Sequence, residues 1–399
     1  MLALATIPIL PLLALAPLAE TYTVHPTPGV ADFLSPAAAL ASPLVGDGDR
    51  IEVLPGTYAA PLLVDKAVRL VAVAGPAFTV LDAAGGGTVL TITAGATVRG
   101  FTITGCGEFV TVGGVAITSV APVRLAENVI VDNHPVGDVG IPVGGVWVAA
   151  GATARLRDNE IRGNTSLSVG GFFAGPTSSF ELFRDRIHGN GGAPTITGGA
   201  LLGGSGRFVD VQVTGNHGSG IGGIFWAGGM PFPDGATLEL LSCTIHGNVA
   251  GSPVGSVGGL YFDDGGIVTV RNTLIHSNLG SAGSDLLFSS DFSSPPVLGI
   301  LDVDYSMIGM PTGGYVPGPH MLPPFAAPGL VAPVSATPFG PTAGGDFRPA
   351  AGSLLLDAGL GSAFPPELPP TDALGLTRFF GAETDVGAFE RQPAHIRRR

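Results

Sequence analysis

The central part of the chain, from about Val98 to Phe288, repeats one short pattern of apolar and polar positions. Each copy has an apolar residue, a second apolar residue five positions later, and in most copies an Asn three positions after that. The closing Asn residues stand at 133, 164, 190, 216, 248 and 278, so the steps between them are 31, 26, 26, 32 and 30 residues. A fixed phrase separated by loops of variable length is typical of a solenoid, in which each unit buries its apolar face by stacking on the next.

The spacing inside each unit is that of β-strands, and no i, i+3, i+4 stripe is long enough for a helix. Gly and Asn close the units, and these residues tolerate the positive φ of a tight corner. Short strands with such corners predict an all-β parallel β-helix with three strands per coil and about 9–11 coils. Leucine-rich repeats and propeller blades fit the pattern less well, because neither of their signature sequences recurs.

Residues at the same place in successive coils should lie ~4.8 Å apart and form columns along the solenoid. We expect two columns to point inward, one that runs from Val98 to Val270 and one that runs from Ile103 to Ile275. The closing Asn residues should form an amide ladder in which each side chain bonds the next. The alternative for this Asn column is a ligand site at the corner.

Composition narrows the class further. The chain has 63 Gly, 12% charged residues and a net charge of −13, with Lys66 as its single lysine. Nucleic-acid binding is disfavoured, since it needs a basic face. Residues 1–19 are predicted to be an export signal, because Ile7 to Leu18 is apolar and Ala16 to Ala19 is rich in small residues; the alternatives are a misassigned start or an apolar arm on the first coil. No transmembrane span is expected after this signal.

The stretch Gly48 to Tyr58, with Leu62 to Ala72 after it, reads GDRIEVLPGTY and LLVDKAVRLVA. It resembles the first coil of secreted right-handed parallel β-helix proteins of the pectin-lyase-like superfamily. The resemblance covers roughly residues 45–290 and implies a right-handed, single-stranded solenoid. Residues 32–44 are Ala-rich and predict a short helix, broken at Pro36, as an N-terminal cap. We therefore assign residues 20–305 to the solenoid with this cap.

The C-terminal third differs in character. Residues 306–345 are rich in Pro and Gly and predict an extended segment. Residues 346–390 resemble the choice-of-anchor Q segment of bacterial surface β-helix proteins, whose blocks occur here in order at Ser353 to Gly359, Asp372 to Arg378 and Asp385 to Glu390; Leu354 stands where that family has Pro. We expect this segment to pack on the solenoid, with Leu354, Leu355, Leu356 and Phe389 in a shared core, and to cover the edge of the last coil. Residues 391–399 form a short basic tail.

Enzymes of the resembled superfamily act on polysaccharides, but their motifs are incomplete here. The resemblance implies clustered Asp and an Arg base for a pectate lyase, and Asn-Thr-Asp, Asp-Asp, Gly-His-Gly and Arg-Ile-Lys blocks for a polygalacturonase. Asn216-His217-Gly218 lacks the preceding Gly, and the acidic pair Asp263 and Asp264 has no partner block in the next coil. This pair is a weak ligand candidate. No cofactor is expected, and Ca²⁺ has no supporting motif.

Three columns carry the remaining candidates. The catalytic candidates occupy one place in four successive coils: Glu127, Asp158, Arg184 and Asp210. Such an acid–Arg–acid row can bind sugar hydroxyls or perturb a carboxylate pKa, and its structural alternative is an exposed salt-bridged ladder. Trp147, Trp226 and Tyr261 follow the Gly-Gly pairs and should stand outward to stack on sugar rings. His188, His246 and His276 share a column, but a metal site needs three or four ligands, so none is assigned.

These observations support two functional hypotheses. The first is a secreted or surface-associated β-helix, a monomer, with a binding or structural role on glycans or the cell envelope. The second is a polysaccharide lyase or glycoside hydrolase that uses the flank from Glu127 to Asp210. The second requires an open groove with carboxylates ~5–10 Å apart.

Overall fold

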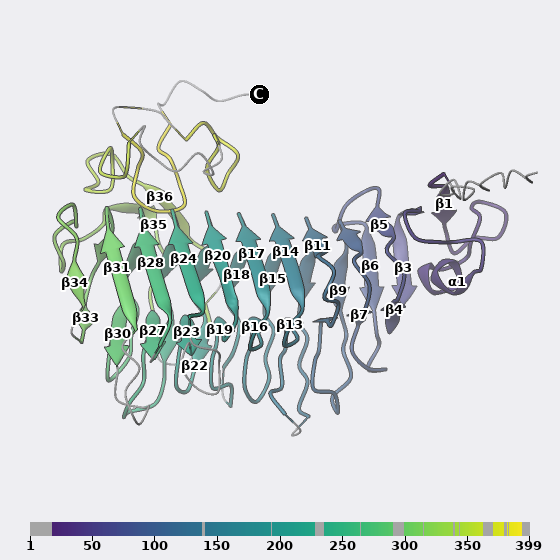
Figure 1. Ribbon diagram of the computed structural model, residues 1–399, viewed down its shortest axis with the longest axis horizontal. Helices are drawn as coiled ribbons and strands as arrows, with labels where there is room; N and C mark the ends of the chain where they lie inside the picture. Colours follow the sequence, from purple (N-terminus) through teal and green to yellow (C-terminus); the bar gives the residue numbers. More distant parts are fainter. Residues whose placement is uncertain are drawn as a thin grey trace, which may run out of the picture.

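The computed structural model describes residues 18–392, except 138–139, 193, 228–234, 264, 290–298, 314, 338–339, 343, 362–369, 379–380 and 382. Three parallel sheets run the length of an elongated solenoid (Figure 1), so the predicted parallel β-helix is confirmed. Within the described residues, no helix is long and apolar enough to span a membrane. Most of the expected export signal, residues 1–17, and most of the basic tail, residues 393–399, lie outside the described residues.

Each coil contributes one strand to each sheet, in the chain order A, B, C. Sheet A has 12 strands: β1 (Thr21–Val24), β2 (Arg50–Val53), β5 (Arg69–Ala72), β8 (Thr97–Arg99), β11 (Val123–Ala126), β14 (Thr153–Arg157), β17 (Ser179–Phe183), β20 (Ser205–Val209), β24 (Thr237–Leu241), β28 (Ile267–Arg271), β31 (Ile300–Asp304) and β34 (Val316–Pro317). Sheet B has ten strands: β3 (Gly56–Ala59), β6 (Thr79–Asp82), β9 (Thr102–Thr104), β12 (Val129–Val131), β15 (Glu160–Arg162), β18 (Arg186–His188), β21 (Gln212–Thr214), β25 (Thr244–His246), β29 (Leu274–His276) and β32 (Met307–Ile308). Sheet C has ten strands: β4 (Leu62–Val64), β7 (Leu90–Ile92), β10 (Val115–Ile117), β13 (Val146–Val148), β16 (Phe172–Ala174), β19 (Ala200–Leu202), β23 (Ile224–Ala227), β27 (Leu260–Asp263), β30 (Leu286–Ser289) and β33 (Pro311–Thr312).

The apolar columns fill the interior of the solenoid. Ile130 is in register with Ile161, which is followed in the next coils by Ile187, Val213 and Ile245, and all are fully buried. Val98, Leu125 and Leu156 are register partners in the second column, on sheet A. Because the side chains of a strand alternate between its faces, one residue in two points into this core and its neighbours point out. Both inward columns are as expected.

The closing Asn residues form a buried amide ladder. The side-chain amides of Asn133, Asn164, Asn190, Asn216 and Asn248 each donate to the Oδ1 of the next Asn at 2.9–3.1 Å. This confirms the structural interpretation of the column. A second ladder, which the sequence analysis missed, lies at the corner between sheets A and B: Asn128 donates to Asn159 at 3.0 Å, and Asn159 donates to Asp185 at 2.8 Å.

The N-terminal end of the solenoid is covered by a short helix of six residues, α1 (Pro36–Ala41). Ser35 caps it by accepting a hydrogen bond from the Ala38 amide, and Ala39 and Leu40 are buried in the core. Pro36 begins this helix and does not break it, because the first helical position needs no amide donor.

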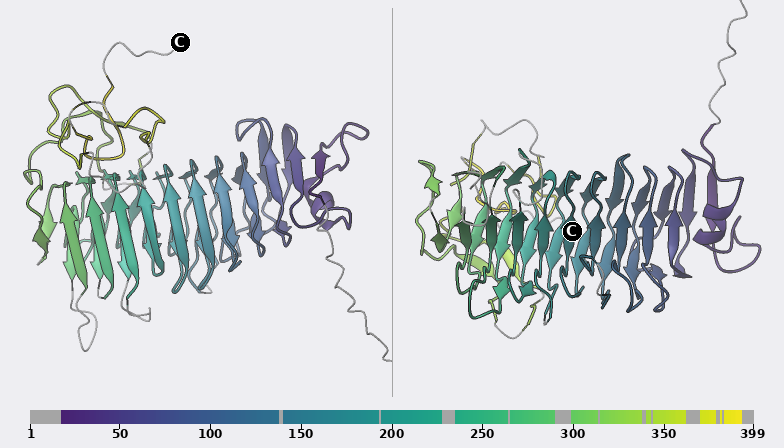
Figure 2. Two further views of the ribbon diagram at one scale, coloured as in Figure 1. Left: turned by 45° about the horizontal axis from the view of Figure 1, so that its top comes forward. Right: turned by 60° about the horizontal axis from the view of Figure 1, so that its bottom comes forward.

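The solenoid continues past the boundary expected at 305, since β32 and β34 still pair with the preceding coil. The chain then turns back along the flank, where β35 (Leu330–Ala332) pairs antiparallel with β36 (Asp346–Pro349). The final segment packs on this flank over the later coils, above β24 to β31 in the view of Figure 1 and also in Figure 2. It does not close the end of the last coil as expected.

The segment has a shared core with the solenoid. Leu355 and Val386 pack with Leu274 of β29 and Met307 of β32. Leu354 is 45% exposed, so its expected place in this core is wrong. Leu355, also expected there, is buried in this core, whereas Leu356 is half-buried. Phe389 is buried in a separate cluster with Phe347.

Candidate functional site

The four catalytic candidates lie at the corner that follows each strand of sheet A. Glu127, Asp158, Arg184 and Asp210 have φ values of 54°, 56°, 56° and 58°, which places all four in the left-handed region. Since this conformation is unfavourable for residues other than Gly, its recurrence in successive coils reflects the path of the solenoid. The row is therefore first of all a structural corner.

Ion pairs occupy most of this row. Arg184 forms two hydrogen bonds with Asp158, at 2.7 and 2.8 Å. Glu127 is held by Arg99 of the preceding coil, again with two bonds at 2.9 Å. Arg157 also lies 3.2 Å from the Asp158 carboxylate, so both acidic residues of this row are engaged by arginines.

Asp210 does not face an open groove, contrary to the expectation. It is fully buried and forms an ion pair with Arg378 of the C-terminal segment, which is also fully buried. Burial raises the pKa of the Asp210 carboxyl to about 7, and the adjacent Arg378 guanidinium offsets part of that rise. Arg184 also reaches this segment and donates to the Thr371 hydroxyl at 3.2 Å. Asp210 and Arg184 therefore fix the segment to the solenoid.

The aromatic candidates lie on sheet C, away from this corner. Trp147 stands outward and half-buried beside Val143, Val169 and Phe173. Tyr261 also stands outward, and its ring stacks on Phe225 with centroids 5.0 Å apart.

Trp226 is fully buried, so its expected outward orientation is wrong. The second residue of β13 is Trp147, and its counterpart in β23 is Phe225; Trp226 is the third residue and points into the core. Asp263 closes β27, and Asp264 lies outside the described residues. These side chains do not converge with the corner row.

The described residues contain no group of three or more His, Cys, Asp or Glu side chains placed to hold a metal ion. His188 bonds Glu160 at 2.8 Å, which lowers the pKa of that carboxyl. His246 and His276 stack with centroids 6.4 Å apart, and burial lowers the pKa of His246 to about 4.

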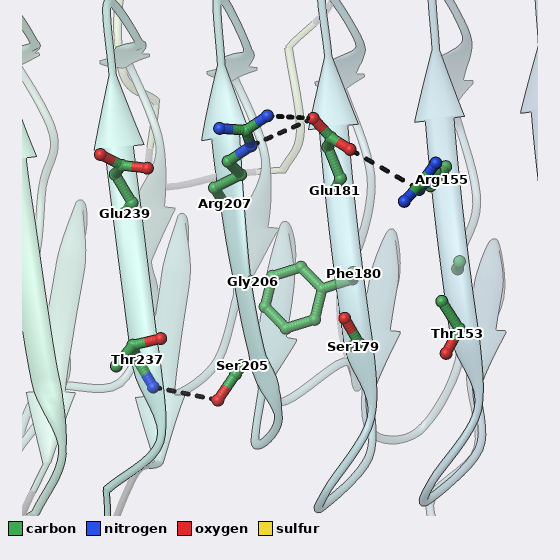
Figure 3. Close-up of a pocket in the computed structure, with 11 residues that line it drawn as sticks. Thr153, Arg155, Ser179, Phe180, Glu181, Ser205, Gly206, Arg207, Thr237 and Glu239 are labelled. Carbon is green, nitrogen blue, oxygen red and sulfur yellow. Dashed lines mark hydrogen bonds and ion pairs between the residues drawn. The ribbon is translucent and has the colours of Figure 1, made fainter. Parts of the chain in front are cut away.

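A groove that the sequence analysis missed runs over the outer face of sheet A. Its middle row alternates in charge across β14, β17, β20 and β24 (Figure 3), with the residues Arg155, Glu181, Arg207 and Glu239. Arg207 bonds Glu181 at 2.6 Å, and Arg155 lies 3.8 Å from the same carboxylate. A parallel row of hydroxyl side chains borders it: Thr153, Ser179, Ser205 and Thr237.

The β-helix core supports this surface from beneath. Gly206 lies beside Phe180 on the adjacent strand and has no side chain of its own. The Phe180 ring occupies the space next to it, and a Cβ at position 206 would lie 2.4 Å from that ring. Phe180 makes edge contacts with Phe172 and Phe208 inside the solenoid. The strands that carry the two rows are thus held on a packed aromatic cluster.

The groove becomes predominantly basic toward the N-terminal coils. A region of about 480 Å³ is lined by Arg124, Arg155, Arg157 and Arg207, with Glu181 as its one acidic side chain. Arg124 is exposed and, in the described part of the chain, has no side-chain hydrogen bond or ion pair. Arg157 lies over the Phe183 ring, 4.9 Å from its centroid.

A sequence signal for this groove was present. Arg124, Arg155, Glu181, Arg207 and Glu239 each stand directly before the inward apolar residue that opens the repeated phrase. By strand alternation, that position must face outward.

Comparisons with known proteins bear on the fold. No protein-family model matches the sequence, and no curated protein matches it. The structure is similar to the crystal structure of the pectate lyase Pel9A, with a TM-score of 0.53 and 16% identity over 94% of this chain and 96% of that chain. A pectin methylesterase in complex with a hexasaccharide aligns with 72% of this chain and 78% of that chain, at 12% identity. Its TM-score of 0.29 is too low to indicate the same fold. The chain therefore has the right-handed parallel β-helix fold seen in that pectate lyase.

Proposed function

We propose that the protein is a secreted or surface-associated β-helix that binds an acidic polysaccharide along the outer face of sheet A, without cleaving it. The observation that carries the proposal is the basic groove lined by Arg124, Arg155, Arg157 and Arg207. This cluster stands out on a chain whose net charge is −13. Planar guanidinium groups bind carboxylates with two parallel hydrogen bonds.

The repetition of the groove suits a polymer. Successive coils present the same kinds of side chain at the strand spacing of ~4.8 Å, so a chain molecule laid along the solenoid meets charged and hydroxyl groups at each step. Thr153 and Ser179 contribute hydroxyls beside the arginines. The Phe183 ring adds a flat apolar surface at the edge of the groove.

The state of the carboxylates favours binding over cleavage. A general acid in a glycoside hydrolase needs a carboxyl group whose pKa is raised and which reaches the bond. Asp158 and Glu127 are each held by an arginine, so neither carboxylate is free to reach a sugar bond in the groove. Asp210 has a raised pKa but is fully buried.

The test is affinity electrophoresis of the purified protein on polygalacturonate and on its methyl-esterified form. We expect binding to the acidic polymer that weakens with salt, and at least about tenfold weaker binding for a variant with Arg124→Gln and Arg155→Gln. Arg162→Gln, which changes a half-buried arginine on sheet B outside the groove, should bind as the wild type. An assay for new reducing or unsaturated ends runs in parallel. Their appearance, or equal binding by the double variant, would contradict the proposal.

A further inference from the structure

A second crevice lies between sheet B and the C-terminal segment, away from the groove on sheet A. It has a volume of about 450 Å³, which is within the range of small-molecule sites. Strands β18 and β21 form its floor through Arg186 and Gln212, and the C-terminal segment forms its other walls. Ligand sites are frequent at such junctions between separately packed parts of a chain.

The floor of the crevice holds two polar side chains without partners. Arg186 and Gln212 are register partners on adjacent strands. Gln212 is only 4% exposed. Within the described residues, neither side chain forms a hydrogen bond or ion pair. Both side chains line the crevice, so their polar groups are available to a ligand that has hydrogen-bonding oxygens.

The charges around the crevice leave its floor positive, although Arg186 interacts with the neighbouring Glu160 carboxylate and helps to lower its pKa. Asp346 and Arg348 on the opposite wall bond each other at 2.8 Å, and this pairing lowers the pKa of the Asp346 carboxyl. Glu160, next to Arg186 in the preceding coil, is already bound by His188 at 2.8 Å and by Arg162 at 3.3 Å. A net positive charge beside an amide favours an anionic group with hydrogen-bonding oxygens.

The remaining wall is apolar. Phe347 and Phe389 belong to one buried cluster and line the crevice together with Leu374. Phe347 is held in place by its contact with the His246 ring, 5.4 Å between centroids. A ligand that fits both halves has an anionic end and a flat apolar body.

We propose that this crevice binds a small aromatic carboxylic acid. Arg186 receives the carboxylate through two hydrogen bonds, and the Gln212 amide completes its hydrogen bonding. The rings of Phe347 and Phe389 and the Leu374 side chain contact the aromatic body. The site would then be a small-molecule site separate from the polysaccharide groove, and it does not depend on the function proposed for that groove.

The test is a fluorescence titration of the full-length protein with 2-naphthoate as the probe and neutral 2-naphthamide as its isostere. We expect saturable one-to-one binding of naphthoate, with naphthamide at least about tenfold weaker because it lacks the charge. Arg186→Gln should weaken naphthoate binding about tenfold or more, and Arg186→Lys should restore part of it. Arg155→Gln, on the outer face of sheet A and outside the crevice, should bind naphthoate as the wild type.

Gln212→Leu serves as a second variant, since it keeps the volume of the buried side chain and should weaken naphthoate binding with an unchanged melting temperature. The melting temperature of each variant, followed by circular dichroism, separates loss of binding from loss of fold. The proposal is overturned if naphthoate does not saturate the protein, if naphthamide binds equally well, or if folded Arg186→Gln binds naphthoate as tightly as the wild type.

Discussion

Asp185 occupies a place in the second ladder where the two preceding coils have Asn128 and Asn159. It is fully buried and accepts hydrogen bonds from the backbone and side-chain amides of Asn159 at 2.7 and 2.8 Å, and from the Phe183 amide at 2.9 Å. Burial nevertheless raises the pKa of this carboxyl to about 7. We therefore predict that Asp185→Asn stabilises the protein, and that the gain depends on pH.

The direction of this pH dependence follows from the difference in bound protons between the folded and unfolded protein. Between the ordinary carboxyl pKa of 3.8 and the folded value of about 7, folded Asp185 holds a proton that the unfolded chain has released. The free energy of unfolding therefore falls as pH rises through this window. At 1.36 kcal/mol per pH unit, the full window corresponds to about 4 kcal/mol, and the part between pH 5 and 7 to about 2–3 kcal/mol. The Asn variant lacks this dependence.

Asn159 in the preceding coil shows which hydrogen bonds the new side chain of the Asp185→Asn variant can form. The Asn159 amide donates to the Leu125 carbonyl at 2.9 Å, and Leu156 is the register partner of Leu125. An amide at position 185 should therefore donate to the Leu156 carbonyl. It loses the bond accepted from the Phe183 amide, which costs about 1 kcal/mol. The expected gain is then about 3 kcal/mol at pH 8 and below about 1 kcal/mol at pH 5.

The assay is urea denaturation followed by circular dichroism at pH 5 and pH 8 for both proteins. All other titrating groups are shared, so the difference between the two gains isolates Asp185. Asn159→Asp is the matched reverse change: it faces Asp185 with a second carboxylate, removes two donors, and should destabilise the protein most at pH 8. Equal gains at the two pH values, or a less stable Asp185→Asn variant at pH 8, would refute the reasoning.

Three further predictions concern the ladder, the C-terminal segment and export. Asn190→Leu should cost on the order of 1–3 kcal/mol of unfolding free energy, because it leaves buried ladder groups without partners; an unchanged urea midpoint would contradict this. Truncation before Asp346 should uncover Leu274 and Met307, lower the melting temperature and promote association, and a monomer with unchanged melting would exclude a packing role for the segment. The mature protein should begin near Glu20, which mass spectrometry of protein from the native host can check; an intact N-terminus in the cytosolic fraction would count against export.

Local repetition determined the features that sequence reasoning recovered. Each coil from Leu125 to Asn278 contains its own apolar pair and its own closing Asn, so the inward columns and the Asn133-to-Asn278 ladder follow from stacking similar units. Both need only the register of neighbouring coils, and a regular repeat defines that register. The outward row that contains Arg155 and Glu181 was accessible by the same logic, through its place directly before the inward Leu.

The orientation of a side chain inside a short strand was harder to predict. Trp147 and Trp226 follow similar Gly-Gly pairs, yet one is the second and the other the third residue of its strand. A shift of one residue reverses the face on which a side chain lies. The loops before these strands vary in length, so counting along the sequence could not set this register.

Only the tertiary structure decided which residues meet across long separations. Asp210 and Arg378 are 168 positions apart, and the return of the C-terminal segment along the flank converts a candidate groove residue into a buried ion pair. The same return places Phe347 opposite Arg186 and forms the crevice. The repeat determines the solenoid because its contacts are between neighbouring coils. The docking of the non-repeating segment depends on the packing of surfaces that no local pattern encodes.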